Sequence, residues 1–184
     1  LDLEGMFSNG THLFVIALML ETQPEIGGFI PRKLNPIGTS CGFSSSAVIA
    51  ISLDTQKVDK VIRLSGANAV GGFVVEPGTD NLLIATPGAT DVFTREKCGG
   101  IERINASKLT YEGMAVTELQ MSNGDENGGT VFSFDVDSQG NGIAFVGAGN
   151  FDAPAYKLVR FKADQGLTGL ISDPGVEGLS YFGF

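Results

Sequence analysis

The sequence contains no tryptophan, a single histidine and only two cysteines among its 184 residues. Two cysteines and one histidine at unrelated positions do not make a zinc site. Basic residues are also few, with 12 lysines and arginines against 21 acidic residues and a formal net charge of −9. A negative surface repels phosphate backbones and anionic lipids, so the composition disfavours binding to nucleic acids and to anionic membranes. The simple interpretation of the charge is solubility.

Long apolar runs are lacking as well. The longest, Leu13–Leu20, has eight residues, whereas a membrane-spanning helix needs about 20. Asp2 and Glu4 precede this run, where a secretory signal peptide carries positive charge instead. No segment of ten or more residues has helical periodicity. The sequence therefore predicts neither a membrane span nor a helical fold.

Glycine is abundant, at 26 residues, and it lies in turns between short apolar runs. This pattern is typical of an all-β protein. One unit of four apolar segments occurs over residues 3–64, 70–119 and 130–171, and a fourth copy begins at 176–184. Four strands make one blade of a β-propeller. We predict a single propeller-type domain over 1–184, with three four-stranded blades plus one extra strand in a partial ring; a β-sandwich is the alternative.

The four predicted strands follow the same order in each copy. They cover 3–7, 13–20, 47–53 and 58–64 in the first copy, 70–76, 82–86, 101–105 and 109–118 in the second, and 131–136, 143–147, 156–161 and 167–171 in the third. Leu53, Ile104 and Phe161 are taken as equivalent positions at the end of the third strand. Polarity rises from the second strand to the fourth, which favours a radial blade over a sandwich.

The hairpins between third and fourth strands carry a shared motif. Residues 50–58 read AISLDTQKV, and residues 99–107 read GGIERINAS. Both resemble the repeats of bacterial YVTN/NHL-type propellers, in which an alternating strand is followed by a polar turn and an outer strand. The resemblance extends over nearly the whole chain as a pattern. It implies a propeller of six or seven blades, often secreted or anchored at a bacterial surface, and it implies no reaction.

A second resemblance lies at the start of two predicted strands. Glu4-Gly5-Met6 and Glu177-Gly178-Leu179 are similar to the Glu-Gly-Leu element of phytase-like, calcium-associated propellers. The resemblance implies a metal site at Glu4 and Glu177, with calcium as the cofactor of a calcium-assisted hydrolase. By position, these carboxylates could hold a cation in the central channel or act as an acid–base pair. The alternative is that both are solvated rim residues.

The long predicted loops, 21–45, 87–100 and 148–155, join second to third strands, so in a propeller they share one face of the disc. Function usually resides on loops that a rigid scaffold carries. We therefore expect contacts with a ligand or partner on this face. The candidate binding residues there are Arg32, Lys33, Asp91 and Arg95, although solvated loop charge is the simpler interpretation.

Both cysteines fall in these loops. Cys41 and Cys98 belong to neighbouring copies, so a disulfide between them is geometrically reasonable; two free buried thiols are the alternative. A disulfide points to an oxidising compartment and hence to a secreted or cell-surface protein. Two glycosylation sequons, Asn9-Gly10-Thr11 and Asn105-Ala106-Ser107, fall in predicted exposed turns.

Two further motifs have simple structural interpretations. His12 is predicted to be a solvated turn residue, because residues 44–46, the serine run that a catalytic triad would need, fall on the opposite face. Residues 135–141 are similar to a calcium-binding loop, but the twelfth position, which requires glutamate, is Val146 and no helices flank the segment. A strand followed by a glycine-containing turn explains these residues.

The unpaired strand 176–184 would be an adhesive sheet edge. Three explanations stay open: the chain belongs to a larger propeller, it pairs with a second protein chain, or it donates this strand to a neighbour. We expect an extracytoplasmic propeller that acts as a non-enzymatic binding or structural module. The alternatives are the calcium-assisted hydrolase and a surface protein that self-assembles by strand addition.

Overall fold

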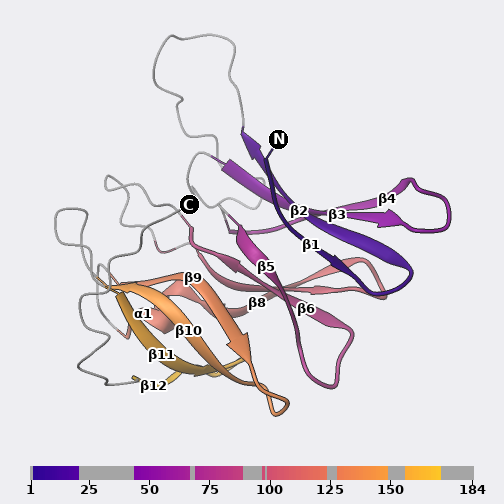
Figure 1. The fold of residues 1–184 in the computed structure, drawn as a ribbon. Helices are drawn as coiled ribbons and strands as arrows, with labels where there is room; N and C mark the ends of the chain where they lie inside the picture. The colour runs from indigo at the N-terminus through magenta and orange to yellow at the C-terminus, as the bar shows by residue number, and fades with distance from the viewer. Residues whose placement is uncertain are drawn as a thin grey trace, which may run out of the picture.

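The computed structural model describes residues 2–20, 44–66, 69–88, 97, 99–123, 128–148 and 156–170. Within these ranges the chain forms three antiparallel four-stranded sheets (Figure 1). The first sheet contains β1 (Asp2–Ser8), β2 (His12–Leu20), β3 (Ser44–Ser52) and β4 (Val58–Arg63). The second contains β5 (Val70–Val75), β6 (Asn81–Thr86), β7 (Gly100–Asn105) and β8 (Thr110–Thr117). The third contains β9 (Gly128–Val136), β10 (Asn141–Ala148), β11 (Tyr156–Lys162) and β12 (Gly166–Leu170).

Each sheet follows chain order, with hydrogen bonds between successive strands only. The prediction of an all-β chain with three four-stranded units is therefore confirmed. The predicted extra strand, 176–184, lies outside the described residues. The turns between first and second strands lie at the same end of each sheet as the turns between third and fourth strands. We call this the turn end, and the opposite end the connection end.

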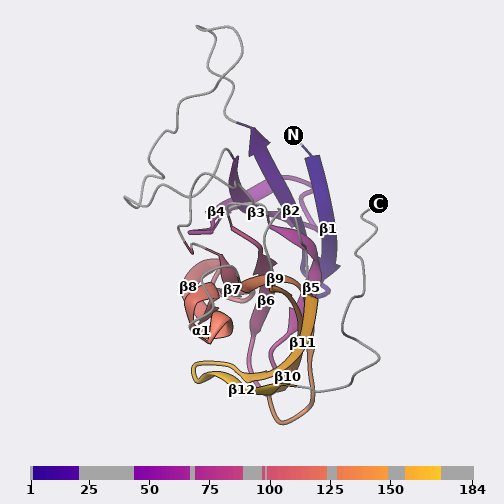
Figure 2. The same ribbon diagram turned by 90° about the vertical axis from the view of Figure 1, so that its left-hand side faces the viewer.

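A short helix, α1 (Glu118–Ser122), follows β8 and was not predicted. The fourth strand of the second copy was expected to reach residue 118, but it ends at Thr117. The Thr117 side chain accepts a hydrogen bond from the Gln120 backbone N–H, and the Gln120 side chain accepts one from the Thr117 N–H, which together form a capping box. Five residues are too few for helical periodicity to appear in a sequence. Figure 2 shows α1 beside β8, and no helix in the described part of the chain is long and apolar enough to cross a membrane.

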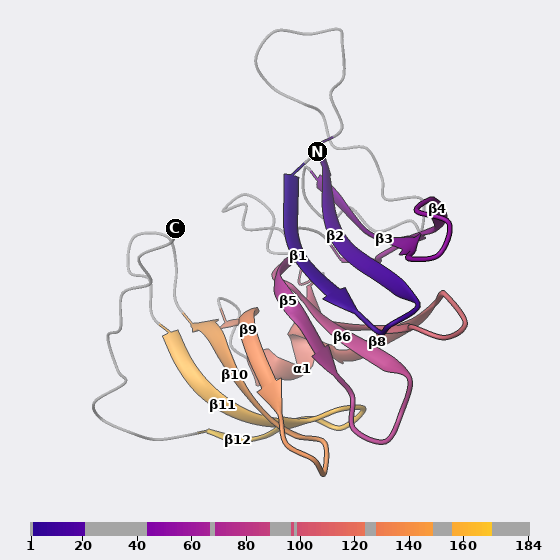
Figure 3. The same ribbon diagram turned by 45° about the vertical axis from the view of Figure 1, so that its right-hand side comes forward.

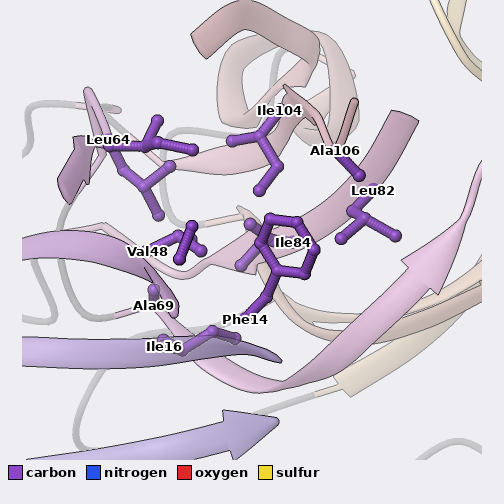
Figure 4. Close-up of a cluster of buried hydrophobic side chains, with 11 residues drawn as sticks. Phe14, Ile16, Val48, Leu64, Ala69, Leu82, Ile84, Ile104 and Ala106 are labelled. Atoms are coloured by element: carbon purple, nitrogen blue, oxygen red, sulfur yellow. The ribbon is translucent and has the colours of Figure 1, made fainter. Parts of the chain in front are cut away.

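The second sheet is covered on both faces. Leu82 and Ile84 of β6 pack against the first sheet, whereas Leu83 and Ala85 pack towards the third. Figure 4 shows the first of these clusters, in which the ring of Phe14 from β2 lies beside Ile84. Successive strand residues point to opposite faces, so a strand that is buried on both sides reads as a continuous apolar run. Each of these leucine, isoleucine and phenylalanine side chains contributes about 1.5–3 kcal/mol when fully buried.

The first strands of the three sheets lie side by side. β1 contacts β5, and β5 contacts β9, as Figure 3 shows. At the first of these contacts the backbones approach so closely that a Cβ atom on Gly5 would lie 2.2 Å from the carbonyl oxygen of Gly71. Glycine is required at residue 5 for this reason, since any side chain would push the two strands apart.

The strand registers correct one predicted equivalence. The second and third strands pair His12 with Ser52, Asn81 with Asn105 and Asn141 with Lys162. One residue further along, Leu53 is therefore equivalent to Ala106 and Ala163, and the prediction that it matches Ile104 and Phe161 was wrong. The error is a shift of two residues. Because side chains alternate with a period of two, such a shift preserves the apolar pattern and cannot be detected from it.

Candidate functional site

Of the predicted site residues, all but Glu4 lie outside the described part of the chain. This holds for Arg32, Lys33, Asp91 and Arg95, for Glu177, and for Cys41 and Cys98. The proposed contact surface, the second ligand of the proposed calcium site and the proposed disulfide therefore stay predictions.

Glu4 is described, and it is exposed on β1. It lies at an irregularity in the pairing of β1 with β2, between Leu3 and Gly5. Among the residues that the structure describes, no three or more histidine, cysteine, aspartate or glutamate side chains are grouped so that they could hold a metal ion. Glu4 therefore has no described acidic neighbours that would complete a calcium site with it.

The segment 135–141 forms the end of β9 and a tight turn, as predicted. Asp137 Oδ1 accepts hydrogen bonds from the backbone N–H groups of Gln139 and Asn141, at 2.8 and 2.9 Å, and Oδ2 accepts one from Asn141 Nδ2 at 3.0 Å. The hydrogen bonds from the side chain and backbone of Asn141, and from the backbone of Gln139, lower the pKa of the Asp137 carboxyl group. This carboxylate builds the turn.

His12 begins β2, and the prediction that it is a solvated turn residue needs correction. Its side chain is only 20% exposed, and its Nε2 lies 3.0 Å from Oδ2 of Asp59 on β4. Its Nδ1 lies 3.0 Å from Oγ1 of Thr11. The order acid, histidine, hydroxyl is that of a catalytic triad. However, Thr11 Oγ1 also donates a hydrogen bond to Asn9 Oδ1 at 2.9 Å, which directs its proton away from the histidine.

The sequence could not identify Asp59 as the partner of His12. Asp59 is 47 residues away from His12 in the chain and lies in an exposed outer strand that reads as ordinary solvated charge. The two side chains meet because β3 pairs with β2 on one side and β4 on the other.

The most buried charged side chain in the described chain is Glu102 of β7, at 0% exposure. Its Oε2 accepts hydrogen bonds from the Ser65 backbone N–H at 2.7 Å and the Ser65 hydroxyl at 2.9 Å. Its Oε1 accepts one from the Gly66 N–H at 2.9 Å. Residues 65 and 66 follow β4 on the way to β5. Glu102 therefore binds the connection between the first and second sheets to β7, an inner strand of the second sheet.

A tyrosine extends this network. The Tyr111 hydroxyl lies 2.6 Å from Ser65 Oγ. Because that serine donates its own proton to Glu102, Tyr111 is the donor. Burial raises the pKa of the Tyr111 phenol, and the negative charge of Glu102 raises it further. Gly66 has no room for a side chain, since a Cβ atom would lie 2.6 Å from Thr86 Oγ1 and 2.8 Å from Glu102 Oε1.

Glu118, at the start of α1, makes comparable contacts between the second and third sheets. Its Oε2 accepts a hydrogen bond from the Gly99 N–H at 3.0 Å, and its Oε1 accepts one from the Thr130 hydroxyl of β9 at 2.9 Å. The carboxylate is nearly buried, at 6% exposure. Both buried glutamates thus stabilise the connection end of the sheets.

An arginine joins the same two sheets at the turn end. Arg103 of β7 donates from Nε and Nη2 to the carboxylate of Glu76, at 2.9 and 2.6 Å. Its Nη1 and Nη2 also donate to the carboxylate of Asp164, which lies in the turn after β11, at 3.1 Å each. Burial lowers the pKa of the guanidinium group, but the hydrogen bonds to Asp164 and Glu76 outweigh it and raise the pKa overall. Arginine–carboxylate pairs joined by two hydrogen bonds are strong and directional.

The sequence did not identify these charged residues. The segment 101–105 was predicted to be a half-exposed strand because its apolar and polar residues were read as alternating. In the structure, residues 100–102 and Ile104 are buried. The signal that could have identified them is an acidic and a basic residue inside a short apolar strand. A strand with one solvated face has the same residue pattern, so this signal does not distinguish the two.

The face of the third sheet that points away from the second has an open hollow of about 490 Å³. Asp135, Ile143, Arg160 and Thr168 contribute to its walls. Ile143 is 50% exposed, and Arg160 is exposed. We call this surface the far face of the third sheet. On the same sheet, the rings of Phe145 and Tyr156 stack with their centres 5.0 Å apart.

No protein-family model matches this sequence, and no curated protein matches it.

Proposed function

We propose that the three sheets are consecutive blades of a β-propeller that works outside the cytoplasm as a non-enzymatic binding or structural module. The close approach of β1 and β5 at Gly5 carries this proposal. The first strands of propeller blades surround the central axis, where space is narrowest and backbones converge. The side-by-side order of β1, β5 and β9 supports the same arrangement.

The buried charges support a structural role for the described residues. Glu102, Glu118 and Arg103 each join elements that are far apart in the sequence, and their polar atoms contact backbone groups or opposite charges of the protein itself. Binding is assigned to the connection end, where the strands flank the loops with Arg32, Lys33, Asp91 and Arg95. A rigid stack of sheets would hold those loops in place.

The arrangement of blades is tested by electron microscopy of the 184-residue chain. Ring-shaped or arc-shaped particles with a central opening would support the propeller. Two sheets packed face to face, without any opening, would contradict it in favour of a sandwich.

Calcium distinguishes the proposal from the calcium-assisted hydrolase. We expect the melting temperature to be equal in calcium and in chelator, and we expect no phosphate release from phytate or p-nitrophenyl phosphate. Stabilisation by calcium that is lost in Glu4→Gln and Glu177→Gln, together with phosphate release, would favour the hydrolase. Glu112→Gln, at an exposed position of β8, serves as a control because it makes the same change of surface charge.

The extracytoplasmic location depends on Cys41 and Cys98. A disulfide between them would be expected in an oxidising compartment. Mass spectrometry of unreduced, alkylated protein tests for it. Two alkylated thiols in the native protein would remove this support for secretion.

A further inference from the structure

The contacts between successive sheets use the same positions each time. Phe14, Leu83 and Ile143 are equivalent, because each lies two residues after the start of its second strand, at the same point in the ladder. Phe14 is buried between the first and second sheets, and Leu83 between the second and third. Ile143 is 50% exposed on the far face of the third sheet. This face therefore has an apolar residue at the position where each of the other two sheets packs against the next sheet.

The turn after the third strand makes the matching contact from the other side. Ala106, in the turn of the second sheet, is 5% exposed and packs with the first sheet. Ala163, in the turn of the third sheet, packs in the same way against the hydrophobic cluster between the second and third sheets. Their equivalent in the first sheet is Leu53, which is larger and 46% exposed. The first sheet thus presents an apolar turn residue that makes no comparable contact within the described chain.

In the interface between the second and third sheets, a charge pair lies beside these apolar positions. Arg103 pairs across the ladder with Leu83, and Arg160 pairs in the same way with Ile143. Asp164, which binds Arg103, immediately follows Ala163. The residue that immediately follows Leu53 is Asp54, which is exposed. Arg160 of the third sheet is therefore equivalent to Arg103, and Asp54 of the first sheet is equivalent to Asp164. The two residues lie on the two outermost sheets of the described chain.

The face of the first sheet that points away from the second is apolar as well. Leu3 and Met6 of β1 are 60% and 69% exposed, and Val61 of β4 is 48% exposed. Met6 pairs with Val15, and Val61 pairs with Ile49, so these residues share that face. Exposed apolar side chains that share one face of a sheet are a feature of interaction surfaces.

We propose that the first sheet of a second copy of this chain docks on the far face of the third sheet. Leu53 of one copy covers Ile143 of the other, and Asp54 enters the hollow to bind Arg160. The contact is head to tail, so two copies can form two identical interfaces and close. A closed pair contains six four-stranded sheets, which is within the range of known propellers; this closure depends on the propeller proposed above, whereas the contact itself does not.

Charge reversal tests the contact directly. Sedimentation of the wild-type chain should show a mass of twice 19.3 kDa. Arg160→Glu and Asp54→Arg should each raise the dissociation constant of the dimer by about tenfold or more, because like charges then meet at both interfaces. A mixture of the two variants should form a heterodimer of wild-type affinity, since one interface then has the reversed pair and the other has the native pair. Native mass spectrometry distinguishes this heterodimer from either homodimer.

Lys157→Glu is the matched control, because it makes the same charge change on the same strand at a position that points to the opposite face. It should leave the dimer intact. A wild-type chain that is monomeric at every concentration would overturn the proposal, as would a dimer that neither reversal weakens. An open-ended polymer that responds to both reversals would support the contact and contradict the closed propeller. A monomer with a ring-like or arc-like shape would support the propeller and contradict the contact between copies.

Discussion

Arg103 and Asp164 lie on neighbouring sheets and are joined by two guanidinium–carboxylate hydrogen bonds of 3.1 Å each. The same guanidinium group also binds Glu76 within its own sheet. The exposures of the two acids are very different: the Glu76 side chain is 13% exposed and that of Asp164 is 67% exposed. The buried pair should therefore dominate stability, because water screens the exposed one.

We predict that Arg103→Met lowers the free energy of unfolding by about 3–5 kcal/mol, since it leaves Glu76 buried without its cation. Asp164→Asn should cost less than about 1 kcal/mol. Urea unfolding of both variants checks the difference. Equal losses would contradict the assignment of Glu76 as the principal partner.

The buried network at Glu102 provides a second prediction. In Glu102→Gln an amide NH₂ replaces an oxygen that faces backbone N–H donors, so we expect a loss of about 1.5–3 kcal/mol. Tyr111→Phe removes only the outer donor and should cost about 1 kcal/mol. The control is Glu112→Gln on β8, where the side chain is exposed and no effect is expected. Denaturant unfolding measures all three variants, and an unaffected Glu102→Gln would refute the anchoring role.

A pH dependence follows from Asp137. Its carboxyl pKa is lowered in the folded chain, so the carboxylate contributes stability that is fully present above the unfolded pKa of about 3.9 and is lost as the pH falls through the folded pKa. Asp137→Asn should therefore melt below the wild type at neutral pH, and the difference should shrink in acid below about pH 4. Melting curves at several pH values check this. A constant difference would show that ionisation of Asp137 plays no part.

Two nearby glycines test the close approach of the first strands. A Cβ atom at residue 5 would meet backbone at 2.2 Å, whereas one at Gly72 would meet nothing within 4 Å. Gly5→Ala should therefore destabilise the chain by about 1–3 kcal/mol through overpacking, and Gly72→Ala should do so by much less. Thermal unfolding compares them. Similar melting temperatures would mean that β1 and β5 are not in contact in solution.

The two sequons should differ if the chain is made in a eukaryotic secretory pathway. Asn9 is exposed, and its side chain accepts hydrogen bonds through Oδ1. Asn105 is half-buried, and its Nδ2, the atom to which a glycan would be attached, donates a hydrogen bond to Asn81. We predict a glycan at Asn9 and none at Asn105. Peptide mapping after enzymatic removal of glycans identifies the modified site, and a fully glycosylated Asn105 would contradict the structure.

Much of the architecture was predictable because its signals are local. The run Leu82–Ala85 is apolar at every position, and a strand with both faces covered requires that. The turn at residues 137–141 was predicted from its aspartate, glycine and asparagine, which make the turn by themselves. α1 was missed because its five residues are too few to show a period.

The candidate site was less predictable, because its residues meet over long separations. His12 and Asp59 are in one sheet but on strands that do not pair with each other. The strand 101–105, which contains Glu102 and Arg103, was predicted to be half-exposed because an amphipathic strand has the same residue pattern. Their partners are distant in the sequence: Ser65 lies in the connection between the first and second sheets, and Asp164 lies in the turn after β11. Burial of a charge depends on those partners, and no local pattern reports them.

Within the described residues, the sequence by itself determined the twelve strands, their tight turns and their grouping by four, because alternation, β-propensity and turn chemistry act within about ten residues. Only the tertiary structure decided which faces are covered, how the ladders are registered and which charges pair. A shift of two residues between copies of the repeat leaves the apolar pattern unchanged, so only the strand pairings showed that Leu53, Ala106 and Ala163 are equivalent. The same structure buries Glu102 and half-buries Arg103, because hydrogen bonds with distant segments offset the cost of removing their charges from water.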